Sequence, residues 1–140
     1  MALAFVVTLE KPLPDPAPLA AFEKAKTGKA LGRESDRLDH AARIKRVEAI
    51  TSLLSESQDA LRAQLVADGF DPSKMRLPPE VFFPAAEGLK TIRALHEHVS
   101  AKLNDFKQPN PILRDLKAAE ALLTAAEAAG VKFHFTKVDL

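Results

Sequence analysis

The sequence contains no cysteine, and this absence excludes several kinds of chemistry at once. Disulfide bridges, thiolate nucleophiles and cysteine-based zinc sites all need the missing side chain. Tryptophan and tyrosine are absent as well, so the aromatic platforms on which single-stranded nucleic acids usually stack are missing. Any function has to be carried by other side chains.

Strong net charge and long apolar runs are also absent. The 140 residues carry 20 basic and 19 acidic side chains, a formal net charge of +1, so no global field draws in nucleic acid or an anionic membrane. The apolar run near the N-terminus has about seven residues, whereas a membrane-spanning helix needs roughly 20. It also lacks the basic segment and the small-residue cleavage site of a secretory signal. We therefore expect a cytoplasmic protein that does not bind membranes.

Motifs for nucleotide and acyl chemistry are missing too. Gly28 and Lys29 look like part of a phosphate-binding loop, but that loop needs a glycine where Glu23 stands and a hydroxyl residue where Ala30 stands. Neither the Gly-x-Ser-x-Gly elbow nor the glycine-rich dinucleotide fingerprint occurs. We predict no catalytic residue, no cofactor and no metal, and we favour a non-enzymatic protein.

Composition and length predict one soluble domain, residues 1–140, with two short strands. Hydrophobic residues make up 46% and charged residues 28%, a balance typical of folded globular proteins. Residues 3–10 are apolar on both alternating faces, which predicts a strand covered on both sides, and four prolines end it. Residues 131–138 alternate, with Phe133 and Phe135 on the dry face and His134 either exposed or packed at an interface. We expect the first strand to pair with the last.

The residues between the strands predict about five helices, so the expected fold class is mainly α. The first spans about 18–26 and the second begins near Ser35, with Asp36 as its cap. Its apolar face rotates by roughly 150° before Val47, so we expect a break or a sharp bend between Arg43 and Val47.

Three further helices follow the break. A Ser55–Gln58 capping box predicts a helix that ends at Gly69, with Leu61, Leu65 and Val66 as its apolar residues. The next carries one apolar stripe from Leu89 to Phe106. The last has Asn110 as its cap and runs to Gly130.

Polar residues on these helices are candidates for a site. His96 and His98 are two positions apart, about 200° around a helix, so they cannot hold one metal ion together. We expect His96 to be partly buried beside the apolar stripe and His98 to point outward. Glu87 stands in a first turn, where a carboxylate suits the helix dipole.

A ligand site would need side chains from separate helices. His40 lies four residues after Asp36, a spacing that ordinarily makes a pair along one helix. The alternative to a non-enzymatic function is therefore a small enzyme or ligand-binding protein. Its site would combine Asp36, His40, Arg43, Glu87 and His96.

The basic residues of segment 24–46 offer a second alternative, weak nucleic-acid binding. Arg37, Arg43, Lys45 and Arg46 would carry it. Acidic residues are interleaved with them, so a solvated helical face explains the pattern better. We do not favour nucleic acid as a partner.

Phe82 and Phe83 are adjacent in a proline-rich loop and are the candidate protein-binding residues. If one packs inward and the other stays exposed, the exposed ring marks a partner surface. If both plug the helical core, they have only a structural role. With no reactive motif present, we expect a protein-protein interaction module, with self-association through a free strand edge as one form of it.

Three segments together resemble a known group of proteins. They are GKALGRESDRLD, FFPAAEGLKTIRAL and AAGVKFHF. In combination they resemble a group of small bacterial proteins with a helical body and a C-terminal Gly-Val-x-Phe-His strand. The resemblance implies a bacterial cytoplasmic protein and carries no activity and no site residues.

Overall fold

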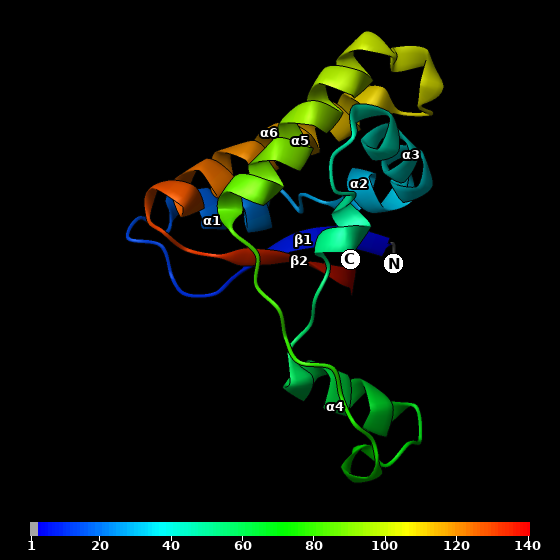
Figure 1. The fold of residues 1–140 in the computed structure, drawn as a ribbon, viewed down its shortest axis with the longest axis vertical. Coiled ribbons are helices and arrows are strands. Elements are labelled where there is room, and N and C mark those ends of the chain that lie inside the picture. The colour runs from blue at the N-terminus through cyan, green and yellow to red at the C-terminus, as the bar shows by residue number, and fades with distance from the viewer. Residues whose placement is uncertain (1–2) are drawn as a thin grey trace.

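The computed structural model describes residues 3–140 and confirms a mainly helical fold with one two-stranded sheet (Figure 1). In chain order the elements are β1 (Leu3–Leu9), α1 (Ala17–Lys24), α2 (Lys29–Arg33), α3 (Ser35–Lys45), η1 (Ile50–Leu53), α4 (Gln58–Ala67), η2 (Pro72–Lys74), α5 (Ala85–Ala101), η3 (Leu103–Asp105), α6 (Pro109–Ala128) and β2 (Phe133–Asp139).

The first strand pairs with the last, as predicted. β1 and β2 are antiparallel, and their register runs from Leu3 opposite Asp139 to Leu9 opposite Phe133. Figure 1 shows α5 and α6 on one side of this sheet and the α4 hairpin on the other. The sheet thus has an inner face, which meets the helices, and an outer face, which looks toward α4.

The core lies between the inner face of the sheet and the long helices α5 and α6. The predicted apolar stripes of both helices are buried throughout these two elements, and so are the inward phenylalanines of β2. These core residues include Leu89, Ile92, Leu95, Val99, Ile112, Leu116, Ala119, Leu123, Ala126, Phe133 and Phe135.

Two glycines bring α2 directly onto the backbone of β1. A Cβ added at Gly28 would lie 2.1 Å from the Phe5 carbonyl oxygen, and one added at Gly32 would lie 2.2 Å from the Leu3 carbonyl oxygen. The Phe5 N–H donates to the Gly28 carbonyl at 3.1 Å. The short segment GKALG therefore covers one end of the outer edge of β1 without room for any side chain.

Two buried carboxylates tie α2 and α6 together in a reciprocal way. Asp115 of α6 accepts hydrogen bonds from the N–H groups of Gly28 and Ala30 at the start of α2, both at 3.0 Å. Glu34, directly after α2, accepts from the N–H groups of Lys107 and Gln108 just before α6, at 2.6 and 3.1 Å. Each carboxylate satisfies backbone donors that a helix start leaves free.

The break predicted between Arg43 and Val47 is confirmed. α3 ends at Lys45, and Arg46 adopts a left-handed conformation with φ of 58°. The Val47 N–H then donates back to the Ala42 carbonyl at 3.0 Å. The change of direction lets Ala42 and Ile50 reach the same core from two differently oriented segments.

Three predicted helix caps are wrong. Ser57, not Ser55, caps α4 by accepting from the Ala60 N–H, because Ser55 is engaged elsewhere. α6 begins at Pro109 rather than after an Asn110 cap, since the fixed φ of Pro109 already suits a first turn. Asp36 does not cap α3; the chain passes from α2 through Glu34 straight into a helix that begins at Ser35.

Two predictions of burial are also wrong. The apolar stripe of α5 does not continue as one helix to Phe106, because α5 ends at Ala101 and leaves Leu103 exposed. His98 does not point outward: it lies at the spacing of the buried face, three residues after Leu95, and its ring packs edge-on against Phe106 at 6.4 Å.

Candidate functional site

The α4 hairpin projects from the body as an arm (Figure 1). We define the arm as residues 56–79 and the neck as residues 54–55 and 80–83. No residue from 54 to 84 is buried, although α4 carries Leu61, Leu65 and Val66 at helical spacing. The apolar side of this helix therefore does not pack against the core of the body.

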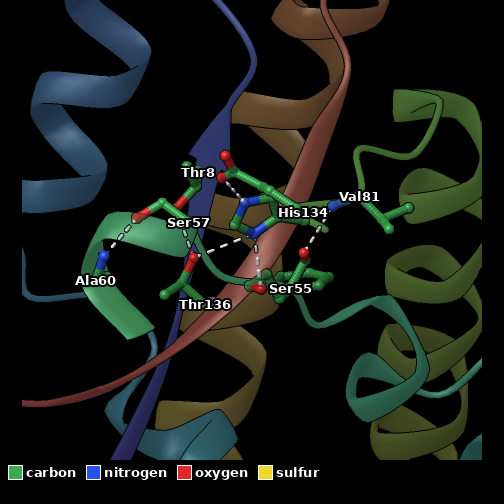
Figure 2. Close-up of polar contacts among 9 residues, drawn as sticks. Thr8, Ser55, Ser57, Ala60, Val81, His134 and Thr136 are labelled. Atoms are coloured by element: carbon green, nitrogen blue, oxygen red, sulfur yellow. Dashed lines mark hydrogen bonds and ion pairs between the residues drawn. The ribbon is translucent and has the colours of Figure 1, made fainter. Parts of the chain in front are cut away.

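The neck adds hydrogen bonds to the outer edge of β2. The Ser55 N–H donates to the Phe135 carbonyl at 3.0 Å on one leg. On the other leg Phe83 and Phe133 exchange two backbone hydrogen bonds, of 2.7 and 2.9 Å. The Val81 N–H donates to the Ser55 hydroxyl at 2.8 Å and so joins the two legs (Figure 2). The arm is thus held at its base rather than tethered loosely.

A buried polar cluster sits under the neck, on the outer face of the sheet (Figure 2). The His134 side chain is only 1% exposed, and its Nε2 lies 2.7 Å from a carboxylate oxygen of Glu80. Its Nδ1 lies 3.0 Å from the Phe135 carbonyl oxygen and 3.2 Å from the Thr136 hydroxyl. The Thr136 hydroxyl in turn bonds that of Thr8 at 2.6 Å.

The partners of His134 constrain its hydrogen bonds. Nε2 faces a carboxylate oxygen, which only accepts, so Nε2 donates its hydrogen to Glu80. Nδ1 lies within reach of both the Phe135 carbonyl and the Thr136 hydroxyl, and which of them it bonds depends on the protonation state of the ring. Since the ring is enclosed, this arrangement anchors the neck and offers no access for a substrate.

The two candidate protein-binding residues belong to the neck. Phe83 is half-buried and packs against the core beside Phe133. Phe82 is also half-buried, and its ring centroid lies 4.9 Å from that of His134. The adjacent rings thus point to opposite sides of the added strand, one into the core and one onto the polar cluster.

The strongly exposed apolar side chains lie further out, on the arm. Val66 is 61% exposed, Phe70 is 57% exposed and Met75 is 46% exposed. At the base of the arm a cavity of about 450 Å³ opens between α4, the returning leg and β2. Its wall is largely apolar and includes Leu61, Pro78 and Val81. Sequence reasoning missed this surface because the helical spacing of Leu61, Leu65 and Val66 does not reveal that their helix stands away from the body.

The helical ligand-site candidates are not brought together as one site. Asp36 and His40 line a cleft of about 420 Å³ between α3 and the end of α5. Arg43 lies outside that cleft, and Glu87 lines a different cavity. His96, half-buried on α5 as expected, lines neither cavity.

Sequence reasoning missed a further residue of that cleft, His98. The side chain is 9% exposed and lines the cavity, with Arg37, Asp105 and Phe106 as its neighbours there. Its spacing from Leu95 was the signal that could have placed it inside.

The buried carboxylates Asp115 and Glu34 have structural rather than reactive surroundings. Burial raises the pKa of the Asp115 carboxyl, and the N–H groups of Gly28 and Ala30 offset only part of that rise. Burial also acts to raise the pKa of Glu34, but hydrogen bonds from Lys107, Gln108 and Arg37 outweigh it and hold that pKa below its usual value. Neither group lines any of the cavities described above.

The basic residues considered for nucleic acid are partly engaged in ion pairs. Arg37 contacts Glu34 at 3.1 Å, and Lys45 contacts Glu97 at 2.8 Å. Arg43 and Arg46 are exposed at the end of α3. The group therefore does not form a continuous row of unpaired cations of the kind that follows a phosphate backbone.

No known protein family, curated protein or solved structure matches this chain. Within residues 3–140, no group of three or more histidine, aspartate or glutamate side chains is placed to hold a metal ion. Over the same range no helix combines the length and the apolar character needed to cross a membrane.

Proposed function

We propose that the protein is a non-enzymatic binding module and that the arm is the part that holds a protein partner. One observation carries this function: residues 56–79 form a folded projection that has no buried residue and yet exposes Val66, Phe70 and Met75. A cluster of exposed apolar side chains marks an interaction surface, because contact of apolar surface with water is unfavourable and a partner removes it.

The neck supports this function by fixing the arm before binding. Hydrogen bonds at Ser55, Glu80 and Phe83 hold both legs on β2. A surface that is already ordered loses less conformational entropy on association than a flexible loop does. A rigid projection of this kind suits a partner with an apolar surface that accepts the arm.

The charge of the arm bears on the chemistry of the partner. Residues 56–79 hold four acidic and three basic side chains, so the arm is slightly net negative. A partner surface that is apolar with basic residues around it would match both properties. The reaction chemistry of an enzyme is not required anywhere in this function.

Affinity capture tests the binding function. The whole chain serves as bait in lysate from cells that naturally make it, beside a Phe70→Ser, Met75→Ser variant. A variant with Ile44→Ser and Leu103→Ser is the matched control, because those side chains are also exposed but lie outside the arm. We expect a partner that the arm variant loses and the control keeps. A partner retained by both variants, or no partner for any bait, contradicts the assignment.

The bacterial and cytoplasmic setting is also proposed. The absence of cysteine is compatible with a reducing compartment, and the resemblance noted above is to bacterial proteins. Fractionation of cells that naturally make the chain, followed by immunoblotting, would place it in the soluble interior. Recovery from the medium or from membranes would contradict this setting.

A second candidate function is the binding of a small polar ligand between α3 and α5. The observation that favours it is the His98 ring, which is 9% exposed and lines a cleft shared with Asp36 and His40. A thermal-shift screen of metabolites tests it. A true ligand would lose its effect in His40→Gln and keep it in Arg43→Gln, since Arg43 lies outside the cleft.

A further inference from the structure

We infer, building on the binding function proposed above, that the partner of the arm is a second copy of this chain. Two molecules pair about a two-fold axis, and each arm lies against the body of the other molecule. In such a pair the arm and the outer face of the sheet form one continuous contact surface.

The exposed apolar residues gather on one side of the molecule, which is the first step of the argument. Eight large hydrophobic side chains are exposed in residues 3–140, and four of them, at positions 66, 70, 75 and 81, belong to the arm and neck. Two more, Leu3 and Leu140, are at the end of the sheet that holds both termini. The arm projects from the side of this sheet that carries no long helix (Figure 1).

The outer face of the sheet is partly uncovered beside the neck. Val6, Thr8 and Val138 are half-buried there, and a cavity of about 320 Å³ next to them extends to Leu140 and α1. The neck covers only the part around His134. A molecule that docks on the arm would therefore meet an apolar floor as well as the arm itself.

The exposure of α4 favours a second copy of the chain over another protein as the partner. α4 has ten residues, and isolated helices shorter than about 12–15 residues are marginal in water. None of the residues of the helix is buried. Burial of its apolar side chains against a partner would add to the order that the neck already gives the arm, and another copy is a partner that is present whenever the chain is made.

Charge adds a smaller contribution to how the two copies are arranged. The arm, residues 56–79, has four acidic and three basic side chains, whereas the other residues have 17 basic and 15 acidic ones. The arm is therefore slightly negative and the rest of the molecule slightly positive. An arm-on-body contact is favoured over an arm-on-arm contact.

Two-fold symmetry makes the contact large enough. A standard interface takes roughly 20–30 residues from each partner, and the arm alone offers about two dozen residues, of which one face can make contact. In a two-fold pair each molecule gives an arm and also receives one, so the same contact is made twice. The doubled contact reaches the size of a stable dimer without any other partner.

Sedimentation equilibrium of the purified full chain, from about 1 to about 100 μM, is the first test. We expect a dimer whose dissociation constant rises about tenfold or more in the Phe70→Ser, Met75→Ser variant, because apolar anchors dominate binding energy. The Ile44→Ser, Leu103→Ser control should leave the dissociation constant unchanged. Circular dichroism shows that each variant is folded. A monomer throughout this range, or a dimer that weakens only in the control, overturns the inference.

Photo-cross-linking separates this inference from the function on which it rests. A photoreactive phenylalanine analogue is placed at position 70 in cells that naturally make the chain, and the adducts are identified by mass spectrometry. An adduct that joins two copies of this chain supports both. An adduct to a different protein keeps the binding function and overturns the second-copy inference. No adduct at position 70, with efficient cross-linking of a positive control, overturns both.

Discussion

The two buried carboxylates allow a sharp test because they use their oxygen atoms differently. In Asp115 one atom, Oδ2, accepts both hydrogen bonds, from Gly28 and Ala30. In Glu34 both oxygen atoms accept hydrogen bonds: Oε1 accepts from the Lys107 N–H and from the Arg37 guanidinium, and Oε2 accepts from the Gln108 N–H. Replacing each acid by its amide therefore has different consequences, because an amide keeps only one acceptor oxygen.

For Asp115→Asn we expect little loss of stability. The amide oxygen can take the place of Oδ2 and satisfy both N–H groups. Burial raises the pKa of Asp115, so the ionised form is disfavoured in the folded protein. The contribution of this group to stability is complete below its unfolded pKa and is lost as pH rises through its folded pKa. At pH 7 the variant should be equal to the wild type or slightly more stable.

For Glu34→Gln we expect a loss of about 2 kcal/mol at pH 7. The amide nitrogen would face the N–H of Gln108, so one donor is left without an acceptor at a cost of about 1–3 kcal/mol. The half-exposed Arg37 loses its ion pair as well, which adds at most about 1 kcal/mol. Because the pKa of Glu34 is lowered, its contribution is complete above the unfolded pKa and is lost as pH falls through the folded pKa.

Urea denaturation of the wild type and both variants, at neutral pH and at several values below about pH 4.5, measures these differences. The deficit of Glu34→Gln should shrink as the pH falls. Glu127→Gln on the exposed side of α6 is the control and should change the free energy of unfolding by less than about 0.5 kcal/mol. If Asp115→Asn costs as much as Glu34→Gln at neutral pH, the assignment of acceptor atoms is refuted.

Three other outcomes are expected from the packing and the neck. Gly32→Ala should destabilise the protein by about 1–3 kcal/mol in urea denaturation, because the added Cβ would lie 2.2 Å from the Leu3 carbonyl oxygen. An unchanged free energy of unfolding would mean that α2 and β1 do not approach so closely. Glu80→Ala leaves Nε2 of the enclosed His134 without its partner, so we expect a loss of about 1–3 kcal/mol and faster hydrogen exchange at the Ser55 and Phe83 amides. Exchange at wild-type rates would argue against the anchor. Replacing residues 56–79 by a short glycine-containing turn should leave the body folded and its thermal unfolding cooperative. The reason is that this segment contains no buried residue and its two ends already meet at Ser55 and Val81. An unfolded product would contradict the independence of the body.

Local patterns predicted the body of the protein well, for identifiable reasons. Residues at helical spacing between Leu89 and Val99, and between Ile112 and Ala126, line one face each, and both faces are buried. The break near Arg46 followed from a shift in helical phase that one straight helix cannot accommodate. The pairing of β1 with β2 followed from the need of two isolated strands for a partner.

Prediction failed where the outcome depends on chain segments that are distant in sequence. The alternation in β2 gives His134 the wet face, but the neck, more than 50 residues earlier, lies over it and encloses it. The apolar spacing of α4 indicates a buried face, and no pattern reveals that this helix stands away from the body. For the ligand candidates, Asp36 and His40 share a cleft because they share a helix, whereas the distance to Glu87 or His96 depends on how the helices pack.

The positions of Phe82 and Phe83 explain how the chain combines a stable body with a free binding surface. Adjacent residues of an extended strand point to opposite faces, so the pair fixes both sides of the neck at once, Phe83 on the core and Phe82 on His134. The residues that stabilise the fold by burial therefore lie in the body and the neck, and the arm contributes no buried side chain. Substitutions on the arm change what the protein binds at little cost to the fold, while substitutions in the neck change both. For this reason Phe70 and Met75, rather than Phe82 and Phe83, are the side chains that report on binding alone.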